Sequence, residues 1–247
     1  MPVFIGLDLA WTPHHETGVC MVEGDERAVR LTQLDCRVET PDGFARLCDA
    51  GDNVVAAIDA PLVVDRERRA ERELNVAFGR YRASAFSANL PFLARMNGLA
   101  GPELAIRLAG RGFALGPSRL ARQATGRFAI EVFPHPAHVV LFELAERIAY
   151  KKGRLAARRN GLRCYQQHLA ALLEREMPGL LVAPEIGWVL DAAALSVTGP
   201  GVKRIEDQLD AVTCVYMAYH CWKHGPDGFR VFGSDEHGTI VTPVLVR

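Results

Sequence analysis

The hydrophobic residues in the first part of the chain gather in short runs that predict buried strands. Residues 3–11 form an apolar run broken by a single acid, which is typical of a strand covered on both faces. Residues 18–22 and 29–36 predict two more strands, with Gly24 and Asp25 marking the turn between them. Because short turns join these three strands, we expect an antiparallel meander.

The rest of the chain alternates between helical patterns and apolar strands. Residues 53–60 and 128–133 predict buried strands that stop at Pro61 and Pro134. This order predicts an α/β fold with one mixed sheet flanked by helices. The expected helices lie at 41–50, 66–76, 101–110, 136–149, 160–176 and 203–223, and a hairpin is expected at 229–246.

The length of 247 residues fits a single domain of this kind, and no repeat or linker divides it. We expect one domain over residues 1–247, with a helical insertion at about 65–127. The six cysteines show no CxxC spacing, and the longest apolar stretch, near 211–222, is too short to span a bilayer. These features predict a cytoplasmic protein that does not enter the membrane.

Three of the predicted strands carry one acid each near their C-terminal ends. The acids are Asp8, Asp59 and Glu131. Asp is disfavoured inside strands, and a buried carboxylate must shift its pKa or acquire a partner. Ligands of α/β sheets gather at the C-terminal ends of the strands. We therefore expect these three side chains to converge.

The helix predicted at 203–223 adds further acids. Asp210 lies on a face whose other positions are apolar or small, and Asp207 and Glu206 precede it by three and four residues. Either pair can point at one place. The preference of acids for helix N-termini explains Glu206 or Asp207, but it explains Asp210 poorly.

Two interpretations of these acids remain open. Converging carboxylates repel one another unless a cation holds them, and sites built only from oxygen ligands select Mg²⁺ or Mn²⁺. Such a cluster suits hydrolysis of a phosphodiester with two metal ions. In the competing interpretation, each acid is neutralised by a basic side chain in a buried ion pair.

The net charge of zero conceals an uneven distribution. Residues 66–127 contain 12 Arg and 4 Glu, and residues 147–163 contain seven bases and no acid. A basic segment beside strand-end acids favours a nucleic-acid partner, because arginine binds phosphate well. The candidate phosphate-binding residues are Arg66, Arg80, Arg82 and Lys152. His135 follows one of the acidic strand ends and is a further candidate for the lining of the site.

Five short motifs occur in order along the chain, namely GLDLAW, AIDAPL, IEVFPHPA, EDQLDA and GSDEHGTIVTP. Together they resemble the RNase H-like superfamily, in particular its RuvC-like branch and an uncharacterised family of predicted nucleases. The resemblance implies an antiparallel three-strand meander extended by parallel strands, and a nuclease that uses two Mg²⁺ or Mn²⁺ ions on DNA or RNA. Asp8, Asp59 and Asp210 would ligate metal, and Asp207 or Glu131 would complete the shell. Resolvase-like enzymes would be homodimers.

One departure separates the chain from RNase H itself, which takes an acid from the helix after the meander. That helix offers only Asp42 and Asp49 here, and the RuvC arrangement does not need this acid. Actin-like proteins and sugar kinases, which carry a glycine-rich turn after the first strand, are more distant, since Ala10 and Trp11 stand there. The alternative function is a non-catalytic module that binds nucleic acid or another partner and retains the fold.

Overall fold

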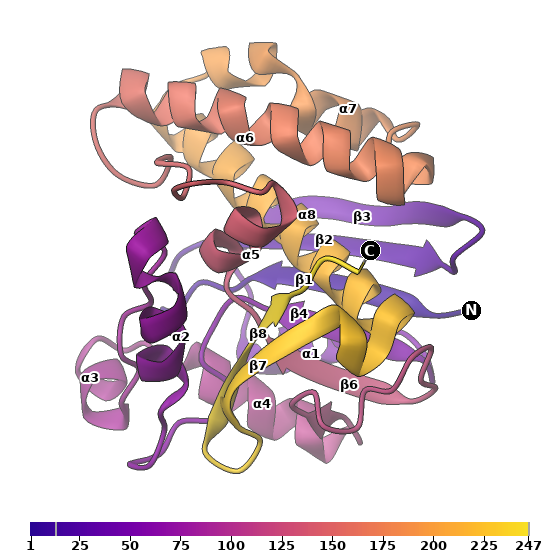
Figure 1. Ribbon diagram of the computed structural model, residues 1–247, viewed down its shortest axis with the longest axis vertical. Helices are drawn as coiled ribbons and strands as arrows, with labels where there is room; N and C mark the ends of the chain where they lie inside the picture. Colours follow the sequence, from indigo (N-terminus) through magenta and orange to yellow (C-terminus); the bar gives the residue numbers. More distant parts are fainter. Residues whose placement is uncertain (13, 247) are drawn as a thin grey trace.

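A six-stranded mixed sheet forms the centre of the computed structural model, which describes residues 1–12 and 14–246 (Figure 1). Its strand order is β3-β2-β1-β4-β6-β5. The first three strands form an antiparallel meander, and the other three run parallel to β1. The strands are β1 (Val3–Asp8), β2 (Thr17–Gly24), β3 (Val29–Arg37), β4 (Val54–Ile58), β5 (Ala114–Leu115) and β6 (Arg127–Glu131).

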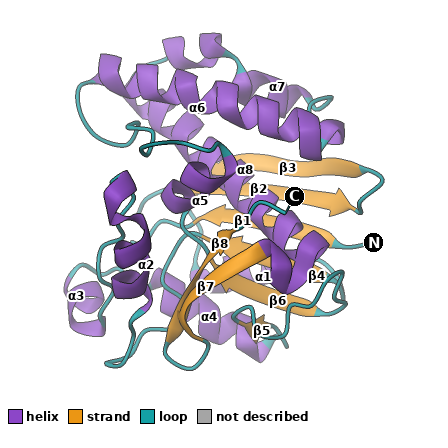
Figure 2. Ribbon diagram, in the orientation of Figure 1, coloured by secondary structure: helices purple, strands orange, loops and turns teal. Residues whose placement is uncertain are grey.

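Helices cover both faces of this sheet (Figure 2). Successive side chains of β1 point to opposite faces of the sheet. Phe4 packs into the core beneath α8, and Ile5 packs into the core beneath α1 and α4. Burial on both faces explains why the strand sequences are continuously apolar. The first layer contains α5 (Pro134–Leu141), α6 (Leu155–Glu176), α7 (Pro184–Leu190) and α8 (Gly199–His224), and the second contains α1 (Pro41–Cys48) and α4 (Ala100–Gly110).

Helix α8 lies directly against the first two strands because two glycines face it. A Cβ atom at Gly6 would lie 2.2 Å from the carbonyl oxygen of Ala211 and 2.3 Å from the backbone nitrogen of Val215. A Cβ atom at Gly18 would lie 2.1 Å from the carbonyl oxygen of Asp207. These contacts set the acids of α8 close to the end of β1.

The basic segment 65–127 is attached to the rest of the fold at several places. Its helix α4 packs on α1, and its strand β5 extends the sheet at β6. Its first helix, α2 (Ala70–Phe78), packs on a hairpin, where Phe78 meets Phe232 at a ring-centroid distance of 5.9 Å. A further short helix of this segment is α3 (Leu90–Arg95), and the hairpin consists of β7 (Phe229–Ser234) and β8 (Gly238–Pro243).

The observed elements confirm the predicted mixed sheet and meander, and most predicted helices are present. The helix expected at 136–149 is shorter, because α5 ends at Leu141 and Glu143 adopts a left-handed conformation at φ +51°. The strand expected at 128–133 is β6, which already ends at Glu131, and Pro134 opens α5. Within the described residues, no helix is both long and apolar enough to cross a membrane.

Substituting Gly6 tests the close packing of α8. We expect Gly6→Ala to destabilise the protein by about 3 kcal/mol, because the new methyl group would overlap the backbone of α8. Gly187→Ala is the matched control, since a Cβ atom there meets nothing within 4 Å and Ala favours the helix. Urea unfolding measures both variants, and equal stability of the two would contradict the packing argument.

Candidate functional site

A cavity of about 500 Å³ opens at the C-terminal ends of β1 and β4. The two strands run parallel and end together, with the Asp59 backbone nitrogen donating to the carbonyl oxygen of Leu7 at 2.8 Å. Asp8 and Asp59 therefore lie side by side in the cavity wall. Around them the cavity is lined by basic and aromatic side chains, among them Arg82, Arg147, Lys151, Lys152, Trp11, Phe86 and Phe133.

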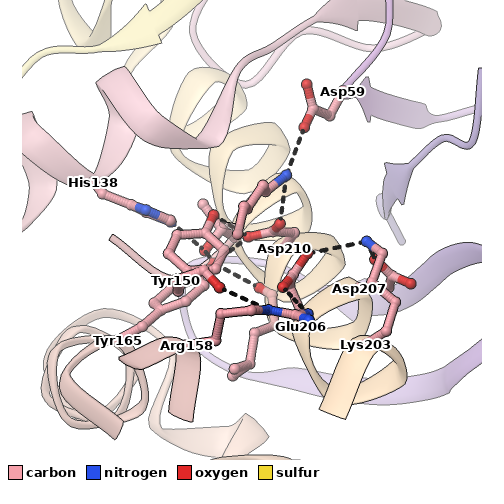
Figure 3. A network of polar contacts seen from close by, with 12 residues as sticks. Asp59, His138, Tyr150, Arg158, Tyr165, Lys203, Glu206, Asp207 and Asp210 are labelled. Atoms are coloured by element: carbon pink, nitrogen blue, oxygen red, sulfur yellow. Dashed lines mark hydrogen bonds and ion pairs between the residues drawn. The ribbon is translucent and has the colours of Figure 1, made fainter. Parts of the chain in front are cut away.

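Lys151 joins the strand-end acids to the acid on α8. Its Nζ atom lies 2.9 Å from Asp210 Oδ2 and 3.9 Å from Asp59 Oδ2, so the two carboxylate oxygens are at most about 7 Å apart. Figure 3 shows Asp59 directed from the end of β4 toward Asp210 on α8. The structure thus brings the strand-end Asp59 and the helical Asp210 to opposite sides of one lysine, an ion pair that the sequence did not predict.

Asp210 is fully buried, and three side chains contact its carboxylate. Its Oδ1 atom accepts hydrogen bonds from the hydroxyls of Tyr150, at 2.7 Å, and Tyr165, at 3.1 Å. Its Oδ2 atom faces the Lys151 ammonium but has no well-directed hydrogen bond. Burial opposes ionisation, but the nearby positive charge of Lys151 and the tyrosine hydroxyl outweigh it and lower the pKa of Asp210.

Two neighbouring aspartates, Asp59 and Asp207, have pKa values shifted in the opposite direction. Burial raises the pKa of Asp59 well above its usual value, and the charges of Asp8 and Asp210 add to the effect. Burial, followed by the charge of Asp8, raises the pKa of Asp207 to about 8, although Lys203 forms an ion pair with it. The elevated pKa values indicate carboxylates that a further cation would stabilise.

The two glutamates are engaged in ion pairs of their own. Glu206 contacts Arg158 and Lys203, each at 3.0 Å. Glu131 lies 2.5 Å from Arg68 and accepts the Leu62 backbone N–H at 3.0 Å. Burial raises the pKa of Glu131 to about 7. The structure thus places Glu131 in a buried ion pair and does not bring it to Lys151 with the aspartates.

The predicted phosphate-binding residues separate into two groups. Arg82 and Lys152 line the cavity, and Arg82 also forms an ion pair with Glu146 at 3.0 Å. Arg80 instead stacks on the ring of Tyr81 at 4.6 Å, beside a different groove, and Arg66 is exposed and does not line the cavity. Arg147 also lines the cavity. It was not among the predicted phosphate-binding residues, although it belongs to the basic segment 147–163.

His135 lines the cavity from the start of α5, as the sequence suggested. It is almost fully buried, and its Nδ1 atom has no hydrogen-bond partner. Burial, together with the nearby charge of Lys151, lowers the pKa of His135 well below its usual value. The imidazole is therefore neutral at physiological pH and adds no positive charge to the cavity.

The aspartates fit a hard divalent cation in donor type and in charge. Among the ion pairs of the described residues, Lys151 contacts Asp59 and Asp210, and Lys203 contacts Asp207, so three of these carboxylates share two lysines. Oxygen donors with excess negative charge are what Mg²⁺ and Mn²⁺ prefer. Within the described part of the chain, no three His, Cys, Asp or Glu side chains are grouped closely enough to hold an ion on their own.

Fold and site together define an α/β protein with a carboxylate-lined cavity at the strand ends of a mixed sheet. Residues 6–230 match the family described as "Protein of unknown function (DUF429)", and the chain belongs to this family. The match includes both strand-end aspartates of the cavity and all the acids of α8. No curated protein matches the chain.

The ion pair between Lys151 and Asp210 can be tested by a double-mutant cycle. We expect Lys151→Met to cost about 3 kcal/mol of unfolding free energy, because it leaves a buried carboxylate without its cation. Adding Asp210→Asn should recover much of this loss. Urea unfolding of the two single variants and the double variant measures the coupling, and simple additivity would contradict the ion pair.

The loss of stability in the Lys151→Met variant should depend on pH. Without Lys151, burial would raise the pKa of Asp210 instead of lowering it. A raised pKa in the folded state stabilises the protein at low pH, and this stability is lost as pH rises. The deficit of Lys151→Met relative to wild type should therefore be smaller at about pH 5 than at about pH 8. An equal deficit at both pH values would show that Asp210 is not the group left unpaired.

Proposed function

We propose that this protein is a divalent-cation-dependent phosphodiesterase, a nuclease of RNase H-like fold that acts on DNA or RNA. The observation that carries the proposal is one cavity that combines two strand-end carboxylates with four basic side chains. An antiparallel meander followed by parallel strands, with acids on the helix that packs on them, agrees with the resemblance of the motifs to RuvC-like enzymes.

Asp8 and Asp59, which lie together in the cavity wall, would hold Mg²⁺ or Mn²⁺ jointly with phosphate oxygens of the substrate, because no three acidic side chains of the described residues meet at one point. Asp210 lies behind Lys151, and Asp207 lies on the same helix. A bound ion of this kind lowers the pKa of a water molecule and neutralises charge on a phosphodiester. The resemblance implies two ions, but Lys151 already places one positive charge between Asp59 and Asp210. We therefore propose one ion with Lys151 as the neighbouring fixed cation.

The basic side chains of the cavity would bind and orient the substrate. Arg82, Arg147 and Lys152 line the same cavity as the two aspartates, so a phosphate near the carboxylates lies within reach of them. Contacts of this type position a strand without reading its bases. Lys151 is held by Asp210 and stabilises negative charge at the floor of the cavity.

One observation favours the second candidate, a nucleic-acid-binding module without catalysis. Lys151 and Lys203 already form ion pairs with Asp210 and Asp207, and Arg68 neutralises Glu131. These pairs provide part of the positive charge that a metal ion would supply. The two candidates differ in metal binding and in turnover, and both can be measured.

Substituting the cavity aspartates tests hydrolysis. We expect Asp8→Asn and Asp59→Asn to reduce Mn²⁺-dependent cleavage of labelled oligonucleotides by about 100-fold, because each removes an ion ligand. Asp52→Asn is the matched control, since that side chain is fully exposed just before β4, at the opposite end of the strand. Gel analysis of cleavage and calorimetric Mn²⁺ titration provide the two readouts.

The outcomes separate the two candidates. If Mn²⁺ binding and cleavage survive unchanged in both Asn variants, the assigned ion site is wrong. If the wild-type protein binds oligonucleotides but neither binds Mn²⁺ nor cleaves, the non-catalytic module is the correct function.

Substituting Lys152, which lines the cavity, tests the binding of phosphate. Lys152→Ala should weaken oligonucleotide binding and reduce the slope of log affinity against log salt by about one, because one phosphate contact is lost. Arg80→Ala should change neither quantity, since Arg80 lies outside the cavity. Fluorescence anisotropy over a salt series measures both, and identical slopes for wild type and Lys152→Ala would exclude this lysine as a phosphate contact.

A further inference from the structure

A small apolar recess opens beside the carboxylate cavity. Its volume is about 80 Å³, and Pro61, Val132 and Ile240 contribute to its apolar wall. Glu71 and Glu131 also line it. A ligand held at the carboxylates can extend an apolar part into the recess, because the two spaces adjoin. The recess and the cavity share the lining residues Trp11, Asp59, Ala85, Phe86 and Phe133.

Aromatic rings from three separate segments stand at this junction. Trp11 follows β1, Phe86 lies before α3, and Phe133 precedes α5. Phe86 is 75% exposed, and the Nζ atom of Lys152 lies 5.2 Å from its ring centroid. An exposed aromatic ring beside a cation offers a flat apolar face and a positive charge to the same ligand.

We infer that the recess binds an unpaired nucleobase of a single-stranded nucleic acid, an inference that rests on the proposed function for the adjacent phosphodiester. A nucleotide combines a flat base, which stacks on aromatic rings, with a phosphate that suits the basic rim. Arg82 and Lys152 supply that rim next to Phe86. Arg82 already forms an ion pair with Glu146 at 3.0 Å, at the surface. An apolar peptide side chain would fit the recess but would offer no anion to the Lys152 ammonium, which stands over the Phe86 ring.

The geometry also selects between single and double strands. In a duplex, neighbouring bases cover both faces of each base, so a base reaches an aromatic ring only by leaving the stack. A single strand does not have to break base pairs to do so. We therefore expect the protein to prefer single strands, or the unpaired ends of duplexes, over continuous duplex.

Binding measurements in EDTA test this inference without cleavage. The probes are a labelled short oligothymidylate, a strand of equal length that lacks bases, and a duplex. Wild-type protein should bind the oligothymidylate about tenfold more tightly than the other two. Phe86→Ala should abolish this preference and leave the affinity for the strand without bases unchanged, whereas Phe86→Tyr should retain it.

Trp188→Ala is the control for loss of an exposed aromatic side chain, because Trp188 is 52% exposed on α7 and lines neither the cavity nor the recess. It should behave as wild type does. Equal wild-type affinity for the strands with and without bases would overturn the inference. A base preference that survives both Phe86→Ala and Trp11→Leu would overturn the location of the base.

Two further outcomes separate the recess from the proposed hydrolysis. Base-dependent binding without any Mn²⁺-dependent cleavage would uphold the recess and reject the hydrolase. Cleavage without base-dependent binding would uphold the hydrolase and reject the recess. Competition by thymidine monophosphate as strong as that by the oligothymidylate would show that the recess takes a free nucleotide, and it would overturn the assignment to a strand.

Discussion

The site depends on the direct packing of α8 against β1 and β2. Gly6 and Gly18 leave no room for a side chain between the strands and the helix backbone. The acids of α8 consequently reach the end of the sheet where Asp8 and Asp59 leave their strands. Any larger residue at Gly6 would push the helix outward and separate Asp210 from the strand-end carboxylates, because a packed interior cannot absorb a displaced helix locally.

This packing concentrates negative charge where water has little access. Two tyrosine hydroxyls and the Lys151 ammonium stabilise the charge of Asp210. The raised pKa values of Asp59 and Asp207 show that the compensation is incomplete. The cost of this arrangement is electrostatic, and the proposed cation would reduce it.

Local pattern predicted the strands well, because strands buried on both faces must be continuously apolar. It also singled out Asp8 and Asp59, since parallel strands that end together bring their last residues to one edge. It failed for short elements such as α3, whose six residues are too few for a helical period to show. The pattern also gave no indication of the ion pair between Lys151 and Asp210. Lys151 lies in a loop whose path depends on the packing of α5 and α6.

The sequence by itself determined the mixed sheet, its order of elements and the acids that stand at strand ends, because side-chain burial imposes these patterns residue by residue. Only the tertiary structure decided which acids share a site. Glu131 has the same strand-end position as Asp8 and Asp59, but it pairs with Arg68, 63 residues earlier in the chain. Asp210 meets Lys151 instead. Partners so distant in sequence are chosen by the packing of whole elements, and no local pattern encodes that choice.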